Sequence, residues 1–414
     1  MKKTLLVLLI LSLIMPMAIF AGGKSETGDK VVEIEFFQRK REVVDLFDTL
    51  IADFEAKNPG ITVEQIHVAD HDQVLASRLA ANKVPDVLTH WPNKADYKET
   101  AKAGFFVDLT DLDVTENCVP EIVNQIRLSN GKNYAVPISV NTQGVFYNKD
   151  LFAAKGYEIP KSWDELMTLV KAIKADEEVA FVWPDGTDFP FEHQFRSFLN
   201  LNSPNAEKMM DEIQAGKKKA QDYPELKTIA EMFFTLREYG QDDMMGTSYE
   251  QAAADFANGK AYMFAQGIWV IPSVQKANPD INFSSFALPS ITGQPTRVEY
   301  GVDLALVIGN TGDEAKMEAS KVFVKFLASK ETAQKYADSD GSPSAIKGVE
   351  FKNEISKPLV DMVQEGKAFR NIRHRWVAGG PERSRTATQQ LIVDGDVDAW
   401  LEELNAIFGH PDYK

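Results

Sequence analysis

Apolar and polar residues alternate along the chain in blocks that predict strands and helices in turn. Residues 31–37 are rich in β-branched and aromatic side chains and predict a buried strand. Residues 42–57 carry apolar side chains at helical spacing, and Asn58-Pro59-Gly60 ends this helix because proline cannot donate the next backbone hydrogen bond. A strand, a helix and a strand follow at 61–66, 73–82 and 86–89. Together these elements form a βαβαβ unit, which predicts a parallel sheet with helices on both faces.

The alternation continues through the second half of the chain. Ser162 and Glu165 form a capping box at the start of another helix. Residues 302–308 are almost continuously apolar, as in a strand that is buried on both faces. Further elements are predicted as helices at 249–257 and 313–328 and as strands at 261–264 and 283–287. The pattern is α/β throughout, with several segments able to pass between two lobes.

The first thirty residues differ from the rest of the chain. Two lysines precede an apolar run at 5–14, and small residues follow at 21–23, which is the layout of a secretory signal peptide. We expect residues 1–21 to be cleaved and residues 22–30 to form a polar tether. The single cysteine, Cys118, is far from this boundary, so there is no lipobox cysteine to acylate. These features predict an exported, periplasmic protein.

The charge balance and the cysteine count restrict the binding partners and the means of stabilisation that this protein can have. The chain has 45 Lys and Arg against 61 Asp and Glu, a net charge of −16. This balance argues against a nucleic-acid partner, because phosphate binding requires a concentrated basic surface. One cysteine excludes an intramolecular disulfide, so large apolar cores must stabilise the fold. The 414 residues are sufficient for two lobes with a core each.

Six short segments appear in a characteristic order and spacing. They are FEAKNPGITV at 54–63, VPDV at 84–87, AGFFVDLT at 103–110, the segment 134–152 with YAVP and FYNKDLF, the segment 256–269 with FANGKAYM and GIW, and the segment 323–343 with FVKFL and GSP. In this order they resemble the extracellular solute-binding proteins of carbohydrate ABC transporters, the maltose-binding-protein-like group. The resemblance extends over about residues 31–345, and its specificity comes from the combination rather than from any one segment.

The resemblance implies a type II periplasmic-binding-protein fold, in which two α/β lobes are joined by a multi-segment hinge. The implied N-lobe comprises 31–138 and 304–347, the C-lobe comprises 143–299 and 350–414, and the hinges lie near 137–143, 300–304 and 346–350. It also implies a monomeric receptor, not an enzyme, that requires no cofactor. Such a receptor captures a sugar or oligosaccharide in the interlobe cleft and delivers it to membrane permease subunits.

A sugar site needs flat aromatic surfaces for C–H faces and planar polar groups for hydroxyls. Trp269 is the first candidate, because the matching tryptophan of the family stacks on the sugar and Gly267 permits close backbone approach; packing in a core is the alternative. Trp91 and Asn93 follow the strand at 86–89, at the carboxyl end where open α/β sheets bind ligands.

Five further residues are weaker candidates for ligand contacts. Arg41 follows the first strand but also suits a solvated helix face. Asn141 lies in the first hinge and matches a cleft-facing polar position of the family. Asp303 interrupts an apolar strand, so it bonds either ligand hydroxyls or a nearby cation, because an unpaired buried carboxylate is costly. Trp183 belongs to an aromatic segment that could form either a stacking surface for the ligand or part of a core. Arg375 either forms bidentate hydrogen bonds to the ligand or neutralises neighbouring acidic side chains.

Other functions remain open at this point. The same fold binds other polar solutes such as a uronate, a polyamine or a peptide, although tryptophans with amide groups favour a neutral sugar. A secreted glycosidase is a further alternative, because such enzymes use paired carboxylates and this acidic chain has many. However, no catalytic motif in the sequence supports an enzyme. His67 and His71, with Asp70 and Asp72, suggest metal capture, for which an exposed polar turn is the simpler interpretation.

Overall fold

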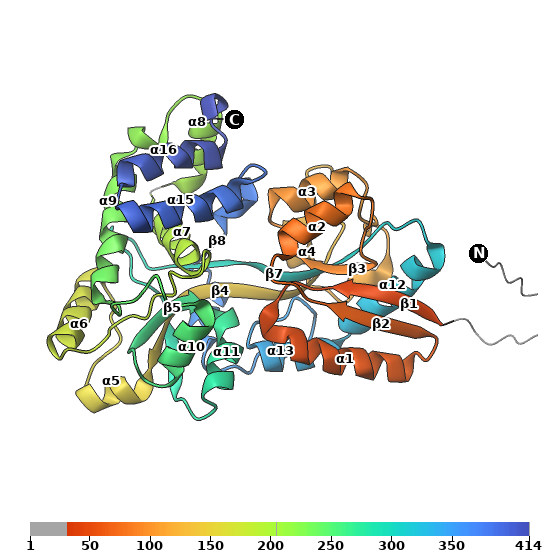
Figure 1. The fold of residues 1–414 in the computed structure, drawn as a ribbon, viewed down its shortest axis with the longest axis horizontal. Helices are drawn as coiled ribbons and strands as arrows, with labels where there is room; N and C mark the ends of the chain where they lie inside the picture. The colour runs from red at the N-terminus through yellow and green to blue at the C-terminus, as the bar shows by residue number, and fades with distance from the viewer. Residues whose placement is uncertain (1–30, 204, 414) are drawn as a thin grey trace, which may run out of the picture.

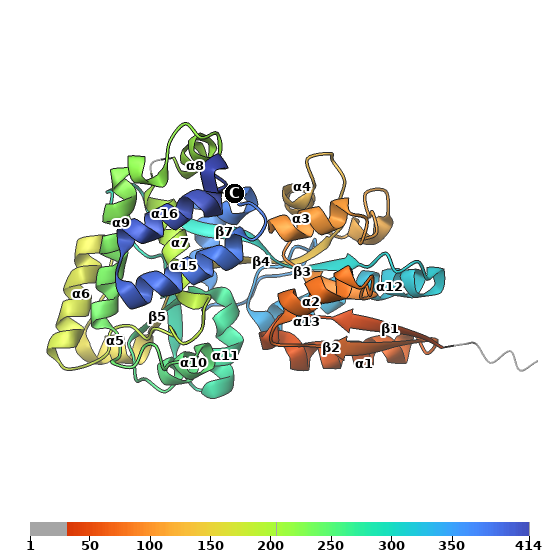
Figure 2. The same cartoon turned by 45° about the horizontal axis from the view of Figure 1, so that its top comes forward.

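The computed structural model describes residues 31–203 and 205–413, and the predicted signal peptide and tether lie outside these residues. The chain forms two α/β lobes that lie side by side along the long axis of the molecule (Figures 1 and 2). We call the lobe that contains the first strand the N-lobe and the other the C-lobe. The predicted fold class is confirmed.

The N-lobe is built on a sheet with strand order β2-β1-β3-β7-β4. Its strands are β1 (Val32–Phe37), β2 (Ile61–Ile66), β3 (Val87–His90), β7 (Val298–Ile308) and β4 (Val136–Asn148). The first three run parallel, as the βαβαβ pattern predicts. However, β7 is antiparallel to both β3 and β4. The antiparallel direction of β7 lies outside the predicted βαβαβ unit and arises because β7 returns from the C-lobe and enters the sheet from the opposite end.

Helices cover both faces of the N-lobe sheet. They are α1 (Val44–Lys57) with the preceding 3-10 turn η1 (Arg41–Val43), α2 (His71–Ala80), α3 (Ala95–Lys102), α4 (Pro120–Ile126), α12 (Glu314–Leu327), α13 (Lys330–Asp340) and the 3-10 turn η2 (Asp113–Thr115). Two adjacent residues of β1 show the two faces. Phe36 packs against Phe47 and Phe323, whereas Phe37 stacks on His71 on the other side. This division follows from the two-residue period of a strand.

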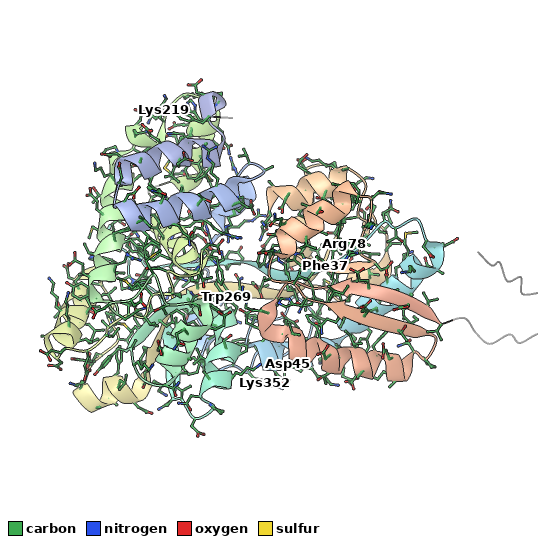
Figure 3. All side chains as sticks on the ribbon, in the orientation of Figure 1. Phe37, Asp45, Arg78, Lys219, Trp269 and Lys352 are labelled. Atoms are coloured by element: carbon green, nitrogen blue, oxygen red, sulfur yellow. The ribbon has the colours of Figure 1, made fainter. Side chains whose placement is uncertain are left out.

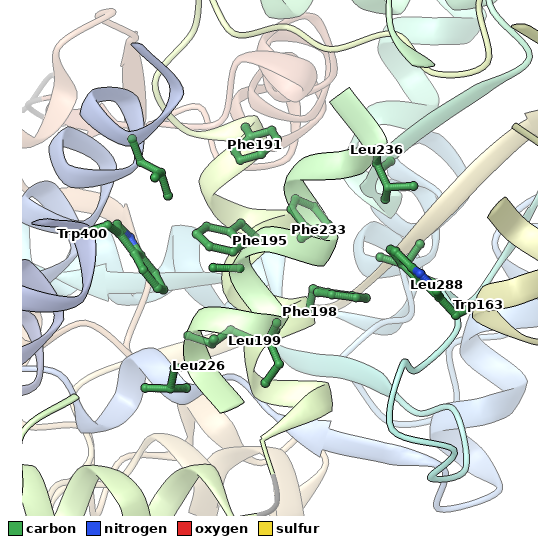
Figure 4. Packing of buried hydrophobic residues seen from close by; sticks show 14 of the residues in the cluster. Trp163, Phe191, Phe195, Phe198, Leu199, Leu226, Phe233, Leu236, Leu288 and Trp400 are labelled. Carbon is green, nitrogen blue, oxygen red and sulfur yellow. The ribbon is translucent and has the colours of Figure 1, made fainter. Parts of the chain in front are cut away.

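The C-lobe pairs the far half of β4 with β5 (Met263–Gly267) and β6 (Phe283–Phe286), and β8 (Ala368–Arg370) pairs with β7. Its α-helices are α5 (Lys149–Lys155), α6 (Trp163–Ala175), α7 (Pro190–Asn202), α8 (Ala206–Gln214), α9 (Pro224–Thr235), α10 (Tyr249–Ala257), α11 (Ile271–Ala277), α14 (Lys357–Gln364), α15 (Gly380–Asp394) and α16 (Val397–Phe408). Its 3-10 turns are η3 (Ala220–Asp222), η4 (Leu236–Tyr239), η5 (Ile268–Val270), η6 (Ile372–Arg375) and η7 (Pro411–Tyr413). The largest core lies around α7, where Phe195 packs against Phe233 and Trp400 (Figure 4).

Three segments connect the lobes. Strands β4 and β7 run through both, and in Figure 1 they form the bridge between them. Asn141 pairs with Gly301 near the middle of this ribbon. The third segment leaves the N-lobe after Ile346, which bridges to Cys118, and reaches the C-lobe at Ile355, whose carbonyl accepts a hydrogen bond from Ser285. The antiparallel β4–β7 ribbon therefore forms the floor between the lobes.

Candidate ligand-binding site

A cleft of about 530 Å³ lies between the lobes, a volume typical of small-molecule sites. Its lining includes Arg39, Lys40, Trp91 and Asn93 from the N-lobe, Phe189, His193, Trp269 and Asn371 from the C-lobe, and Asn141, Gln143, Gly301 and Asp303 from the crossing strands. Both walls and the floor thus contribute polar groups, and each wall carries a tryptophan.

Trp269 lies on the C-lobe wall, in the turn η5 that follows strand β5. Figure 3 shows it on the side of the C-lobe that faces the N-lobe. The indole folds back over Gly267 so closely that a β-carbon at that position would coincide with the ring. The edge of the His193 imidazole meets the ring at 5.6 Å between centroids and 89° between planes. Trp269 is therefore held in one orientation while it lines the cleft.

Trp91 lies on the opposite wall and stacks against a cation. The guanidinium carbon of Arg39 lies 3.4 Å from the indole centroid, and Arg39 donates a 2.7 Å hydrogen bond to Asp72. The backbone N–H of Trp91 donates to Nδ1 of His90 at 2.9 Å. Burial lowers the pKa of His90 to about 3, which keeps this nitrogen available as an acceptor. Trp91 is thus a fixed aromatic surface.

Asp303 forms the centre of a buried network on the N-lobe side of the floor. Its Oδ2 accepts hydrogen bonds from Lys40 Nζ at 2.6 Å and from Ser139 at 3.3 Å, and its Oδ1 accepts from Asn141 at 2.9 Å. Lys40 also pairs with Asp340 at 2.6 Å. Burial lowers the pKa of Lys40, but the two carboxylates outweigh it and hold the pKa well above its ordinary value. Of the two roles considered for Asp303, the structure supports pairing with a cation, and the residue still lines the cleft.

A second polar cluster on the C-lobe side of the floor was missed from the sequence. Glu299 accepts hydrogen bonds from Arg196 Nη1 at 2.7 Å and from the Gln143 amide. Gln143 was identifiable in principle, because it lies two residues after Asn141 and strand residues two apart share a face. Arg196 was not identifiable, because only the packing of α7 brings it to the cleft.

Arg41 lies at the rim of the cleft, where the lobes touch. Its guanidinium forms an ion pair with Glu250 of α10 across the two lobes. The adjacent Glu42 accepts a 3.2 Å hydrogen bond from the Tyr249 hydroxyl. Arg41 is thus a partly exposed interlobe contact that also lines the cleft.

Two candidates lie elsewhere, and the expectations for them are corrected. Trp183 is 1% exposed in the C-lobe core, stacked on Phe181 at 5.2 Å between centroids, so no ligand reaches it. Arg375 forms an ion pair with Asp211 and is not among the residues that line the cleft. The neighbouring Arg373 lines the cleft instead, because residues two apart on a 3-10 turn point in different directions.

The proposed metal ligands are not arranged as a site. Nδ1 of His67 lies 3.2 Å from the backbone carbonyl of Gln38, while His71 stacks on Phe37. Within residues 31–203 and 205–413, no group of three or more His, Cys, Asp or Glu side chains is placed to hold a metal ion. In the same ranges, no helix has the length and apolar character needed to span a membrane.

The two lobes, the three crossings and the cleft between aromatic walls define a periplasmic-type solute-binding protein. Residues 49–360 match the family of bacterial extracellular solute-binding proteins, and the chain belongs to this family. The family resemblance inferred from the six segments is thereby confirmed.

Several characterised proteins are similar over nearly the whole chain. The multiple sugar-binding protein of Streptococcus mutans is 32% identical over 400 residues, which cover 93% of this chain and 91% of that protein. The melibiose/raffinose/stachyose-binding protein MelE of Bacillus subtilis is 23% identical over 84% of this chain and 82% of its own.

Solved structures are also similar to this chain over most of its length. The binding protein RafE in complex with raffinose superposes with a TM-score of 0.83 at 26% identity, covering 93% of this chain and all of that one. The apo form of RafE from Streptococcus pneumoniae gives a TM-score of 0.74 at the same identity, covering 95% of this chain and all of that one. The TM-score is thus higher for the raffinose complex than for the apo form.

Proposed function

We propose that the protein is the saccharide receptor of an ABC importer, which captures a sugar or oligosaccharide in the interlobe cleft and delivers it to the membrane permease subunits. The observation that carries this proposal is the pair of tryptophans, Trp91 and Trp269, on opposite walls of a cleft whose floor carries amide and carboxylate groups. Aromatic surfaces match the C–H faces of a sugar, and the polar floor matches its hydroxyls. The similarity to sugar-binding proteins supports the same ligand class.

Each residue on the cleft has a distinct part in this proposal. Trp269 and Trp91 stack on sugar rings from the two lobes. Asn93 and Asn141 bond hydroxyls, and Asp303 orients the Asn141 amide through the 2.9 Å hydrogen bond between them. Because the contacts come from both lobes, a bound sugar favours the closed arrangement through its differential affinity.

The closing motion takes place at the three crossings. We place the hinges near 137–143, 300–304 and 346–350, where the chain passes between the lobes. The greater similarity to the raffinose complex than to the apo protein supports a closed arrangement here. The interlobe ion pair between Arg41 and Glu250 belongs to that closed state. The receptor acts as a periplasmic monomer after cleavage of residues 1–21, without a cofactor and without catalysing a reaction.

A thermal-shift panel tests the proposal directly. The mature protein is heated with raffinose, stachyose and melibiose, and in parallel with a uronate, a polyamine and a peptide. A ligand at one hundred times its Kd stabilises the native state by about 2.7 kcal/mol, which raises the Tm by several degrees. A rise in Tm with at least one neutral saccharide, together with a decrease in the radius of gyration, is expected. A rise only with the polyamine or the peptide would refute the saccharide assignment.

A further inference from the structure

Gly301 occupies the middle of the cleft floor, in the interior of strand β7. Glycine inside a strand is unfavourable, because it loses more backbone entropy on folding than other residues and offers no side chain to pack. Its φ angle is not among the positive values found at other glycines, so the backbone conformation does not require it. Another cause must account for glycine here.

The packing of the chain does not require glycine at this position either. A β-carbon built on Gly301 lies 3.4 Å from Nδ2 of Asn93 and 3.6 Å from Cβ of Asn371, which are van der Waals distances. Apart from Gly301 itself and its two chain neighbours, no other atom of the described residues lies within 4 Å of this β-carbon. Gly309, which directly follows the end of this strand, is different, because a β-carbon there would overlap the carbonyl oxygen of Pro85. Gly301 is thus a glycine with open space in front of it.

This open space faces the cleft, between amides from both lobes. Gly301 pairs with Asn141 in the β4–β7 ribbon, and Asp303 two residues further along shares its face. Asn93 approaches from the N-lobe and Asn371 from the C-lobe. Oδ1 of Asn371 accepts a 2.9 Å hydrogen bond from the backbone N–H of Arg373, which fixes the amide, and Asn371 lines the cleft.

We propose that the saccharide is seated at Gly301, where it packs directly against the backbone of β7 while Asn93 and Asn371 bond its hydroxyls from either side. The proposal rests on the saccharide function proposed above and locates where the ring is seated. A methyl group at position 301 occupies the space of the ring and holds it away from both amides. Because the amides belong to different lobes, a ring seated on Gly301 also joins the lobes.

The test compares two glycine-to-alanine variants of the mature protein. Gly301→Ala places a methyl group on the floor of the cleft. Gly60→Ala is the matched control, because a β-carbon there meets nothing within 4 Å among the described residues and its φ is not positive. Isothermal titration with raffinose and with stachyose gives Kd, and a thermal scan without ligand gives Tm. We expect Gly301→Ala to raise Kd at least tenfold with an equal or higher Tm, since alanine reduces the entropy of the unfolded chain. Gly60→Ala is expected to leave Kd unchanged.

The outcomes separate this inference from the proposed function. If the wild-type protein binds no saccharide of the panel, the proposed function fails. If it binds raffinose or stachyose and Gly301→Ala binds them with unchanged Kd, the seating on β7 is refuted and the receptor function stands. A fall in Tm that accompanies the loss of affinity assigns Gly301 to strand packing and also refutes the inference. Asn371→Ala provides an independent check, because it removes one amide without altering β7 and is expected to weaken binding of the same sugars.

Discussion

Replacing Gly267 with alanine is expected to disable the Trp269 surface without removing the tryptophan. Gly267 has φ −84° and ψ 166°, an extended conformation that alanine adopts without strain. The added methyl group would nevertheless coincide with the six-membered ring of Trp269. The indole must therefore turn away from its present position over the backbone. The variant therefore tests whether ligand binding depends on the position of the Trp269 ring, because the ring itself is still present.

The size of the effect on Kd follows from the stacking free energy that is lost when the indole is displaced. A base or sugar stacked on a desolvated aromatic side chain gains about 1–3 kcal/mol, so displacement of the indole should raise Kd by about 5- to 150-fold. Overpacking beside the ring should also lower the free energy of unfolding by about 1–3 kcal/mol. The protein stays folded if its stability is in the ordinary range of 5–15 kcal/mol.

A double-mutant cycle measured by calorimetry with raffinose tests this reasoning. Gly267→Ala, Trp269→Ala and the double variant are compared with the wild type, and a thermal scan of each verifies folding. Because both substitutions act through one ring, the double variant should bind no more weakly than Trp269→Ala alone. Additive losses would show that Gly267 acts independently of the indole. An unchanged Kd for Gly267→Ala would show that the position of the ring does not matter.

Three further predictions concern buried residues, two of them at the cleft or next to it and one in the C-lobe core. Lys40→Met leaves Asp303 and Asp340 buried without their cation, and it should lower the free energy of unfolding in urea by about 3–5 kcal/mol; a loss below 1 kcal/mol would contradict the pairing. Because burial lowers the pKa of His90 to about 3, the unfolded chain binds a proton at His90 below pH 6.5 that the native state does not, and this residue alone should lower stability by up to about 1.4 kcal/mol per pH unit between pH 6.5 and pH 3. In urea titrations between pH 7 and pH 5, the free energy of unfolding of His90→Asn should change less steeply with pH than that of the wild type. Equal slopes for the two proteins would refute the lowered pKa of His90. Trp183→Leu should lower the Tm and leave the Kd for raffinose unchanged. Weaker binding at unchanged Tm would instead show that Trp183 contributes to the ligand-binding site.

Most of the elements and the family could be predicted from the amino-acid sequence. The strand at 61–66 and the helix at 249–257 were predicted with the bounds that the structure has, and the helix at 313–328 is within one residue of α12. These elements are set by the spacing of apolar side chains over a few neighbouring residues, and that spacing is visible in any sequence. The order of six short segments was enough to identify the family.

Contacts between side chains far apart in the chain could not be predicted from the sequence. Lys40 and Asp303 are 263 positions apart, and no local pattern indicates that they pair. Trp183 and Trp269 were both candidates for a stacking surface, yet one is buried in the C-lobe core and the other lines the cleft. The direction of β7 depended in the same way on its return from the other lobe. Local periodicity decides where a strand or helix forms, whereas the packing of distant segments decides what each side chain faces.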